Sequence, residues 1–146
     1  MKNKMELSIP ALAENEALAR MVISAFLVQA DPSLSIVSEV RTAVSEAITN
    51  CVVHAYPDAS PGRIVMYAEL NEDRVEIRIE DFGCGIENID QAMRPFFTTQ
   101  PERERTGMGF SLMMSFMDGV KVYSTPGSGT TVQMTKLLCD AREDAV

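Results

Sequence analysis

The sequence predicts an α+β fold, a two-layer sandwich in which a mixed, mostly antiparallel sheet carries helices on one face. The predicted elements run strand, two helices, hairpin, helix and hairpin, so strands and helices do not alternate as they do in a doubly wound sheet. The predicted strand from Arg74 to Glu80 alternates apolar and charged side chains. We therefore expect one face of the sheet to be buried under helices and the other to meet water.

The first part of the chain predicts an edge strand followed by two helices. Residues 5–9 alternate apolar and polar side chains and stop at Pro10, as edge strands often do. Residues 15–30 and 34–54 place apolar side chains at helical spacing, and Asp31-Pro32 separates the two segments.

The second part predicts two hairpins separated by an irregular segment and a helix. The first hairpin joins residues 63–70 to 74–81 through a three-residue polar link. The segment 87–105 has only a weak helical pattern, and a helix is expected over 106–117, ending at Gly119. The second hairpin pairs residues 120–125 with 130–137.

Length and composition indicate a single domain over residues 1–146. Hydrophobic residues make up 46% of the chain, and the net charge of −8 argues against direct nucleic-acid binding. No apolar run approaches the length of a membrane span, and no signal core follows the N-terminus, so we expect a cytoplasmic protein. Three cysteines at unrelated spacings and one histidine predict no disulfide framework and exclude a multi-histidine metal site.

A carboxylate followed by two glycines ends the first hairpin. Asp81 continues the parity of the apolar residues Val75, Ile77 and Ile79, which places it on the buried face of the sheet. The glycines after it allow a sharp turn and a close approach of a ligand to the backbone. Asp81 could accept a hydrogen bond from a flat ligand with an exocyclic amine, such as adenine, or it could only cap the turn.

Two polar residues lie one turn apart on the second helix. Glu46 and Asn50 share one side of it, beside small residues, where a carboxylate and an amide could hold a divalent cation and orient a nucleophile. The alternative is a solvated polar edge, which is the commoner fate of such a pair. His54 extends the same stripe and is expected to interact with the carbonyls at the end of the helix.

The stretch from Thr106 to Gly109 leads into the next helix. Free backbone N–H groups at a helix N-terminus favour anions, and glycines let phosphate oxygens approach closely. Arg103 and Arg105 flank the stretch and could contact phosphate or remain solvated. Taken alone, this pattern also fits a flexible loop before a helix.

The three motifs, in this order and spacing, resemble the ATP-binding fold of the GHKL superfamily, which includes histidine kinases and DNA gyrase. Within that group the chain is most similar to the stand-alone anti-sigma factor serine kinases, in particular those of sporulation. The resemblance covers nearly the whole chain, and it rests on residues 45–50, 81–86 and 106–110. It implies a Bergerat-type fold, with residues 87–105 as a lid over ATP.

The resemblance also implies roles for individual residues. Glu46 would be the general base, Asn50 would coordinate Mg²⁺, and Asp81 would accept a hydrogen bond from the adenine amino group. The remaining residues implied to contact ATP are Gly83, Gly85 and Ile86 at the adenine pocket, Arg105, Thr106, Gly107 and Gly109 at the phosphates, and Thr130 near the adenine.

The implied function is that of an anti-sigma factor with serine kinase activity. Such a protein holds a sporulation sigma factor inactive and phosphorylates a small anti-anti-sigma protein on serine, using ATP and Mg²⁺, and a homodimer is expected. Two alternatives remain from the sequence: an ATP-dependent binding module without transfer activity, and a histidine-kinase-like ATPase domain. Glu46 argues against the first, because a binding module needs no base.

Overall fold

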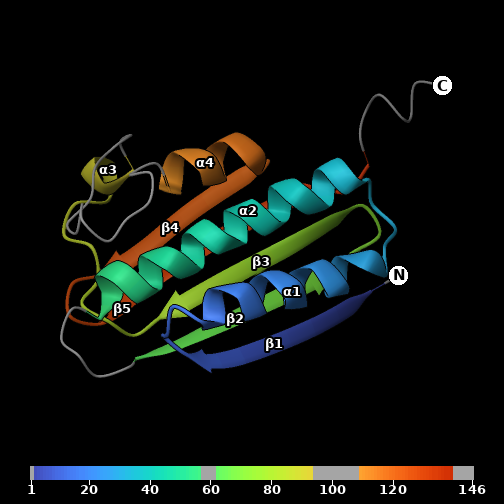
Figure 1. Cartoon of the computed structure of the whole chain (residues 1–146). Coiled ribbons are helices and arrows are strands. Elements are labelled where there is room, and N and C mark those ends of the chain that lie inside the picture. The colour runs from blue at the N-terminus through green and yellow to red at the C-terminus, as the bar shows by residue number, and fades with distance from the viewer. Residues whose placement is uncertain (1, 57–61, 94–108, 140–146) are drawn as a thin grey trace.

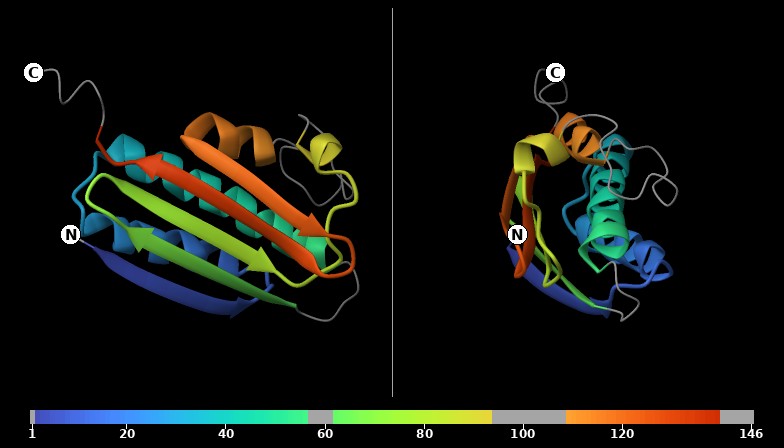
Figure 2. Two further views of the ribbon diagram at one scale, coloured as in Figure 1. Left: turned by 180° about the vertical axis from the view of Figure 1, so that it is seen from behind. Right: turned by 90° about the vertical axis from the view of Figure 1, so that its left-hand side faces the viewer.

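The structure, a computed structural model, describes residues 2–56, 62–93 and 109–139. Figure 1 shows helices lying over one face of a twisted sheet, and the views in Figure 2 show the sheet and the helices as two layers. The predicted α+β sandwich is confirmed. The four strand pairings in the described residues are all antiparallel, so the sheet is antiparallel rather than mixed in this part of the chain.

The sheet has the strand order β1-β2-β3-β5-β4. Its strands are β1 (Asn3–Pro10), β2 (Arg63–Leu70), β3 (Arg74–Asp81), β4 (Gly119–Thr125) and β5 (Gly129–Leu137). Strand β1 is at one edge, as its terminal proline predicts. The final hairpin joins the sheet through β5, which pairs with β3, and this pairing sets Thr130 opposite Asp81.

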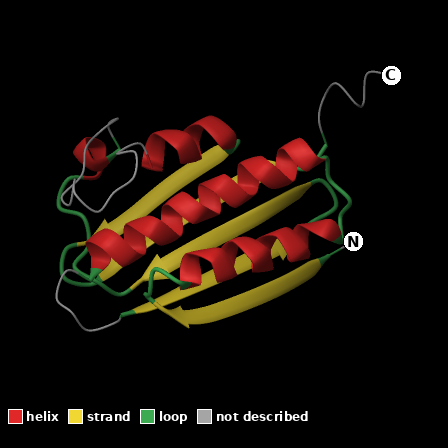
Figure 3. Cartoon of the chain, in the orientation of Figure 1, coloured by secondary structure: helices red, strands yellow, loops and turns green. Residues whose placement is uncertain are grey.

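In the described part of the chain, the helices lie on one face of the sheet and leave the other face uncovered (Figure 1 and Figure 2). They are α1 (Asn15–Val28), α2 (Leu34–Asn50), α3 (Ile89–Ala92) and α4 (Gly109–Phe116). Helix α2 packs between α1 and α4, as the ribbon drawn by secondary structure also shows (Figure 3). Its first turn is capped by Ser33, whose Oγ accepts a hydrogen bond from the backbone N–H of Ile36 at 3.2 Å.

The second helix differs from the prediction at its C-terminal end. Residues 34–54 were expected to form one continuous helix, but the α-helix ends at Asn50 and continues as the π-helix η1 (Cys51–Ala55). The backbone N–H of Cys51 is shared between the carbonyls of Ala47 and Ile48. A wider turn at this position displaces the chain that follows it, and such turns occur often at functional sites.

The core lies between the sheet and the helices. The largest fully buried side chains are Ile23, Leu27, Val40, Val44, Ile48, Ile64, Met66, Leu70, Ile77, Ile79, Met113 and Met134. Lys136 ties the two layers together at the edge of this core, where Nζ donates to Glu39 Oε2 of α2 and to the carbonyl of Phe116 at the end of α4, both at 2.6 Å. These two contacts link the end of α4 to α2, and the two helices also pack directly against each other.

Candidate functional site

Asp81 is buried on the helix-facing side of the sheet, as its parity in β3 predicts. Only 8% of the surface of Asp81 is exposed. Oδ1 accepts hydrogen bonds from the backbone N–H of Gly83 at 3.1 Å and of Thr130 at 3.2 Å, while Oδ2 accepts one from the Cys51 thiol at 3.6 Å. Within the described residues, no lysine or arginine forms an ion pair with it. Burial therefore raises the pKa of Asp81, and the two backbone N–H groups and the thiol offset only part of that effect.

The turn after Asp81 packs directly against the end of the second helix. A Cβ at Gly83 would overlap the carbonyl of Ala55 in η1. The next residue, Cys84, donates its backbone N–H to that same carbonyl at 2.8 Å, and its thiol donates to the carbonyl of His54. Gly83 is therefore needed for close approach, whereas Gly85 adopts a φ of 75°, a conformation that glycine accepts without strain.

A hydroxyl of β4 joins the turn to the last strand. Ser124 Oγ accepts a hydrogen bond from the backbone N–H of Ile86 at 2.7 Å and lies 2.8 Å from Thr130 Oγ1. Ile86 and Thr130 were both predicted to line a ligand pocket. The structure brings them together through Ser124, and it sets Thr130 beside Asp81 as well.

Glu46 and Asn50 lie on the side of α2 that faces the first residue of α4. A Cβ added at Gly109 would lie 3.3 Å from Asn50 Oδ1 and 3.4 Å from Glu46 Oε2. Both side chains are half-buried, and Gly109 is buried. The structure thus assembles three of the residues that the sequence predicted for the phosphate and metal side of the site.

Cys51 connects the two halves of the site. It follows Asn50 in the chain, and its thiol reaches Asp81, so the pair on α2 and the carboxylate on β3 are neighbours through a single buried residue. Burial, and next the nearby charge of Asp81, raise the pKa of the Cys51 thiol, so it stays protonated and donates.

The chemistry of Asn50 fits a bound phosphate and a cation. Its Nδ2 is buried and has no hydrogen-bond partner among the described residues, and a buried donor is costly unless an acceptor satisfies it. A phosphate oxygen would do so, while the amide oxygen at the other end of the group is a ligand suited to Mg²⁺. The space that a side chain at position 109 would occupy, left open by Gly109, lies directly beside this amide.

Several predicted residues lie outside the described part of the chain. These are Arg105, Thr106 and Gly107, together with residues 94–105 of the expected lid. The first part of the segment expected to form a lid is described and contains α3. This helix begins after Asn88, whose Oδ1 accepts the backbone N–H of Gln91 at 3.0 Å.

Sequence reasoning missed Cys51, Ser124 and Tyr56. Tyr56 Oη donates to the carbonyl of Arg63 and accepts from the backbone N–H of Phe82, so it anchors the start of the turn. The parity of β4 placed Ser124 on the same face as Val122, and this was a usable signal for Ser124. For Cys51 the signal was its position directly after Asn50 on the buried arc of the helix.

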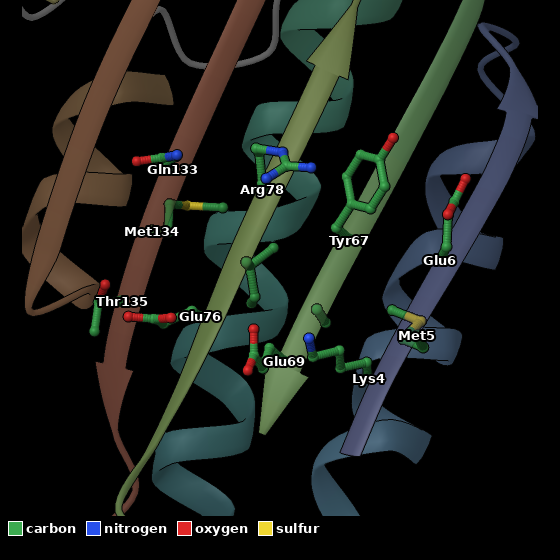
Figure 4. Close-up of a pocket in the computed structure, with 12 residues that line it drawn as sticks. Lys4, Met5, Glu6, Tyr67, Glu69, Glu76, Arg78, Gln133, Met134 and Thr135 are labelled. Carbon is green, nitrogen blue, oxygen red and sulfur yellow. The ribbon is translucent and has the colours of Figure 1, made fainter. Parts of the chain in front are cut away.

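A separate hollow of about 580 Å³ lies on the opposite face of the sheet, away from Asp81 (Figure 4). Side chains of β1, β2, β3 and β5 line it. Its central cation, Arg78, lies over the ring of Tyr67 at 4.1 Å and pairs with Glu80 at 2.9 Å, so neighbouring groups of the sheet already engage its charge. The face without helices is therefore polar, as predicted.

Two further findings concern the part of the chain that the structure describes. Among the described residues no helix is both long and apolar enough to cross a membrane. In the same part of the chain no three His, Cys, Asp or Glu side chains gather into a metal-binding group.

Comparisons with known proteins show the family to which the chain belongs. The family model of the histidine kinase-like ATPase domain matches residues 9–136. An anti-sigma F factor of Pasteuria penetrans is 47% identical over 146 residues, covering 99% of this chain and 97% of the relative. An anti-sigma F factor of Clostridium beijerinckii is also 47% identical, over 134 residues that cover 92% of this chain and 94% of the relative.

A solved structure shares the fold. The crystal structure of the RsbU and RsbW domains of Rv1364c from Mycobacterium tuberculosis matches with a TM-score of 0.69 and 20% identity. The match covers 95% of this chain and 34% of that longer chain.

Proposed function

Since the chain belongs to the family of histidine kinase-like ATPase domains, and within it to that of the anti-sigma F factors, we propose that it is an anti-sigma factor with serine kinase activity. It binds and inhibits a sporulation sigma factor, and it transfers the γ-phosphoryl group of ATP to a serine of a small anti-anti-sigma protein. The cytoplasm, as the site of transcription, is the compartment that this role requires.

The observation that carries the proposal is the grouping of Glu46, Asn50 and Gly109 beside the buried Asp81. Asp81 would accept a hydrogen bond from the adenine amino group, and Gly83, Gly85, Ile86 and Thr130 would shape the pocket around the base. At the other end, the start of α4 at Gly109 would present backbone N–H groups, which at a helix N-terminus favour phosphate oxygens. Arg105, Thr106 and Gly107 are proposed to extend that phosphate contact.

Glu46 is proposed to act as the general base. It lies one helical turn from Asn50, so it would stand next to the phosphates that Asn50 helps to hold. A carboxylate there can take the proton from a serine hydroxyl as the hydroxyl attacks. Mg²⁺ held by the phosphates and Asn50 would neutralise the charge on the phosphoryl group, and phosphoryl transfer relies mainly on such positioning and charge stabilisation.

The acidic character of the protein bears on its partners. A net charge of −8 disfavours direct binding to nucleic acid, so the protein would act on transcription through a sigma factor rather than through DNA. A homodimer is proposed as the form of the protein.

Incubation with γ-labelled ATP, Mg²⁺ and a candidate anti-anti-sigma protein tests the proposal. We expect label on a serine of that protein and binding of a sigma factor in a pull-down. Release of free phosphate without labelled protein would instead support a simple ATPase. Nucleotide-dependent binding with neither product would support a binding module, and the kinase assignment would then be wrong.

A further inference from the structure

The two oxygens of the Asp81 carboxylate have unequal partners. Oδ1 accepts two backbone N–H groups, from Gly83 and Thr130, which occupy both of its lone pairs. Oδ2 accepts only the Cys51 thiol, at a sulfur–oxygen distance of 3.6 Å. The oxygen that remains available to a ligand is therefore the one that Cys51 contacts.

A thiol is well suited to hold such an oxygen without saturating it. The S–H group is a weak donor, and a carboxylate oxygen has two lone pairs, so Oδ2 keeps acceptor capacity for a second donor. Rotation of the carboxylate about the soft Cβ–Cγ torsion moves both oxygens together, so the bonds at Oδ1 and the thiol at Oδ2 resist the same rotation. The third contact, from a side chain that is itself only 4% exposed, narrows the range of directions that Oδ2 can take.

We propose that Cys51 is a positioning residue that orients Asp81 Oδ2 toward the exocyclic amine of the bound base and so sets the preference of the site for adenine. The proposal rests on the proposed ATP-binding function. It adds a residue outside the three motifs to the determinants of base selectivity, and it assigns Cys51 no contact with the nucleotide.

The consequence is a selectivity effect rather than a general loss of binding. Without the thiol, only the two bonds at Oδ1 would restrain the carboxylate, so the direction of Oδ2 would vary more widely and the hydrogen bond to the amine would lose part of its pre-organisation. A base without that amine makes no such bond and would lose little. Purine riboside triphosphate, which has hydrogen in place of the 6-amino group of ATP, is therefore the matched probe.

Titration calorimetry of both nucleotides against wild type and Cys51→Ala tests the proposal. We expect the preference for ATP over purine riboside triphosphate to fall by about twofold to tenfold, the range for one modest hydrogen bond. The ratio of the two affinities is measured within each variant, so a smaller folded fraction affects both nucleotides equally and does not alter it.

Two further variants separate the donor from the volume of the side chain. Cys51→Val fills the space without a donor and should lose the preference as Cys51→Ala does. Cys51→Ser keeps a donor and should retain the preference to within about twofold. Cys139→Ala removes an exposed thiol elsewhere and should match wild type.

The outcomes distinguish this inference from the proposed function. An unchanged preference in Cys51→Ala and Cys51→Val, an equal loss for both nucleotides, or a failure of Cys51→Ser to retain the preference would overturn the role of Cys51. If wild type itself does not prefer ATP over purine riboside triphosphate, the adenine contact of Asp81 fails, and the proposed nucleotide site fails with it.

Discussion

Asp81 is an ionisable side chain in the buried part of the protein, where a charge is unfavourable for folding. Burial raises the pKa of Asp81, so the folded protein binds the proton of this carboxyl group more tightly than the unfolded chain does. Protonation of Asp81 therefore stabilises the folded state. This stabilisation is complete below the ordinary pKa of 3.8 and is lost as the pH rises through the higher pKa of the folded state. At neutral pH the ionised group therefore lowers the free energy of unfolding, and ligand recognition is a reason to retain it.

Asp81→Asn should separate these two effects. The amide oxygen can accept the N–H groups of Gly83 and Thr130, so the free energy of unfolding at pH 7 should be no lower than that of wild type. Binding of ATP should weaken and discrimination against GTP should fall, because the amide can donate as well as accept. Urea unfolding and nucleotide titration measure the two effects. A less stable variant with unchanged ATP affinity would contradict the ligand role.

Glu46→Gln should retain ATP binding and lose phosphoryl transfer. The amide has the shape of the carboxylate but cannot take a proton, and removal of a general base typically costs about a hundredfold to ten-thousandfold in rate. Transfer of label from ATP to the partner protein, measured beside nucleotide affinity, tests this. Undiminished turnover would remove Glu46 from the mechanism.

Asn50→Ala should weaken Mg²⁺-dependent nucleotide binding more than it affects stability. The substitution deletes a buried donor that has no partner among the described residues, so folding should lose little. A Mg²⁺ titration of ATP binding in wild type and variant measures the first effect, and thermal unfolding measures the second. If both stay at the wild-type level, Asn50 is only part of a polar edge of α2.

The burial of Asp81 could be predicted at the residue scale because strand parity is local. The contacts of Asp81 with Cys51 and Thr130 could not, since they depend on how distant segments pack. Thr130 comes into reach through the register of β5 on β3, and Cys51 through the crossing of α2 over the sheet. The approach of Gly109 to Glu46 and Asn50 depends likewise on the packing of α4 against α2.

At the scale of elements, the end of the second helix is the feature that the apolar pattern did not reveal. Spacing of apolar residues indicates that a helix continues, but it does not distinguish an α-turn from a single π-turn. The π-turn matters because it sets the carbonyl of Ala55 against Gly83, and so positions the turn after Asp81.

Gly83→Ala tests this contact between the helix end and the turn. The added methyl group would overlap a backbone carbonyl that cannot move without displacing η1, so we expect destabilisation of about 1–3 kcal/mol together with weaker ATP binding. Gly119→Ala is the matched control, because the nearest atom to its added Cβ is 3.8 Å away. Denaturant unfolding of the two variants should differ clearly; equal midpoints would show that the turn adapts freely.

At the scale of the whole molecule, the layers could be predicted and the order of the strands could not. Hairpins follow from local turns, but the insertion of β5 beside β3 is a pairing between segments far apart in the chain. The apolar residues of α1 cover a wider arc of the helix than the side that packs on the core. Ile23, Phe26 and Leu27 are buried, while other apolar residues of the helix stay exposed: Leu18 at 43%, Val28 at 66% and Met21 at 72%.

This exposed apolar strip of α1, formed by Leu18, Met21 and Val28, is the surface that we expect a partner protein to contact. Arg20 adjoins Met21 and is the only basic residue of the helix, so it could meet an acidic group on the partner. Because Arg20 is only partly buried, Arg20→Glu should leave folding and ATP binding near wild type. Association with a partner, or of the protein with itself, should weaken.

Lys121→Glu on the face without helices is the control for this prediction, since it reverses an exposed charge by the same amount. A pull-down with the sigma factor and sedimentation of the isolated protein measure the two kinds of association. We expect Lys121→Glu to behave as wild type in both and Arg20→Glu to be impaired in at least one. Parallel losses in the two variants would mean that net charge, rather than the α1 surface, governs association. Wild-type behaviour of Arg20→Glu in both measurements would place the interface elsewhere.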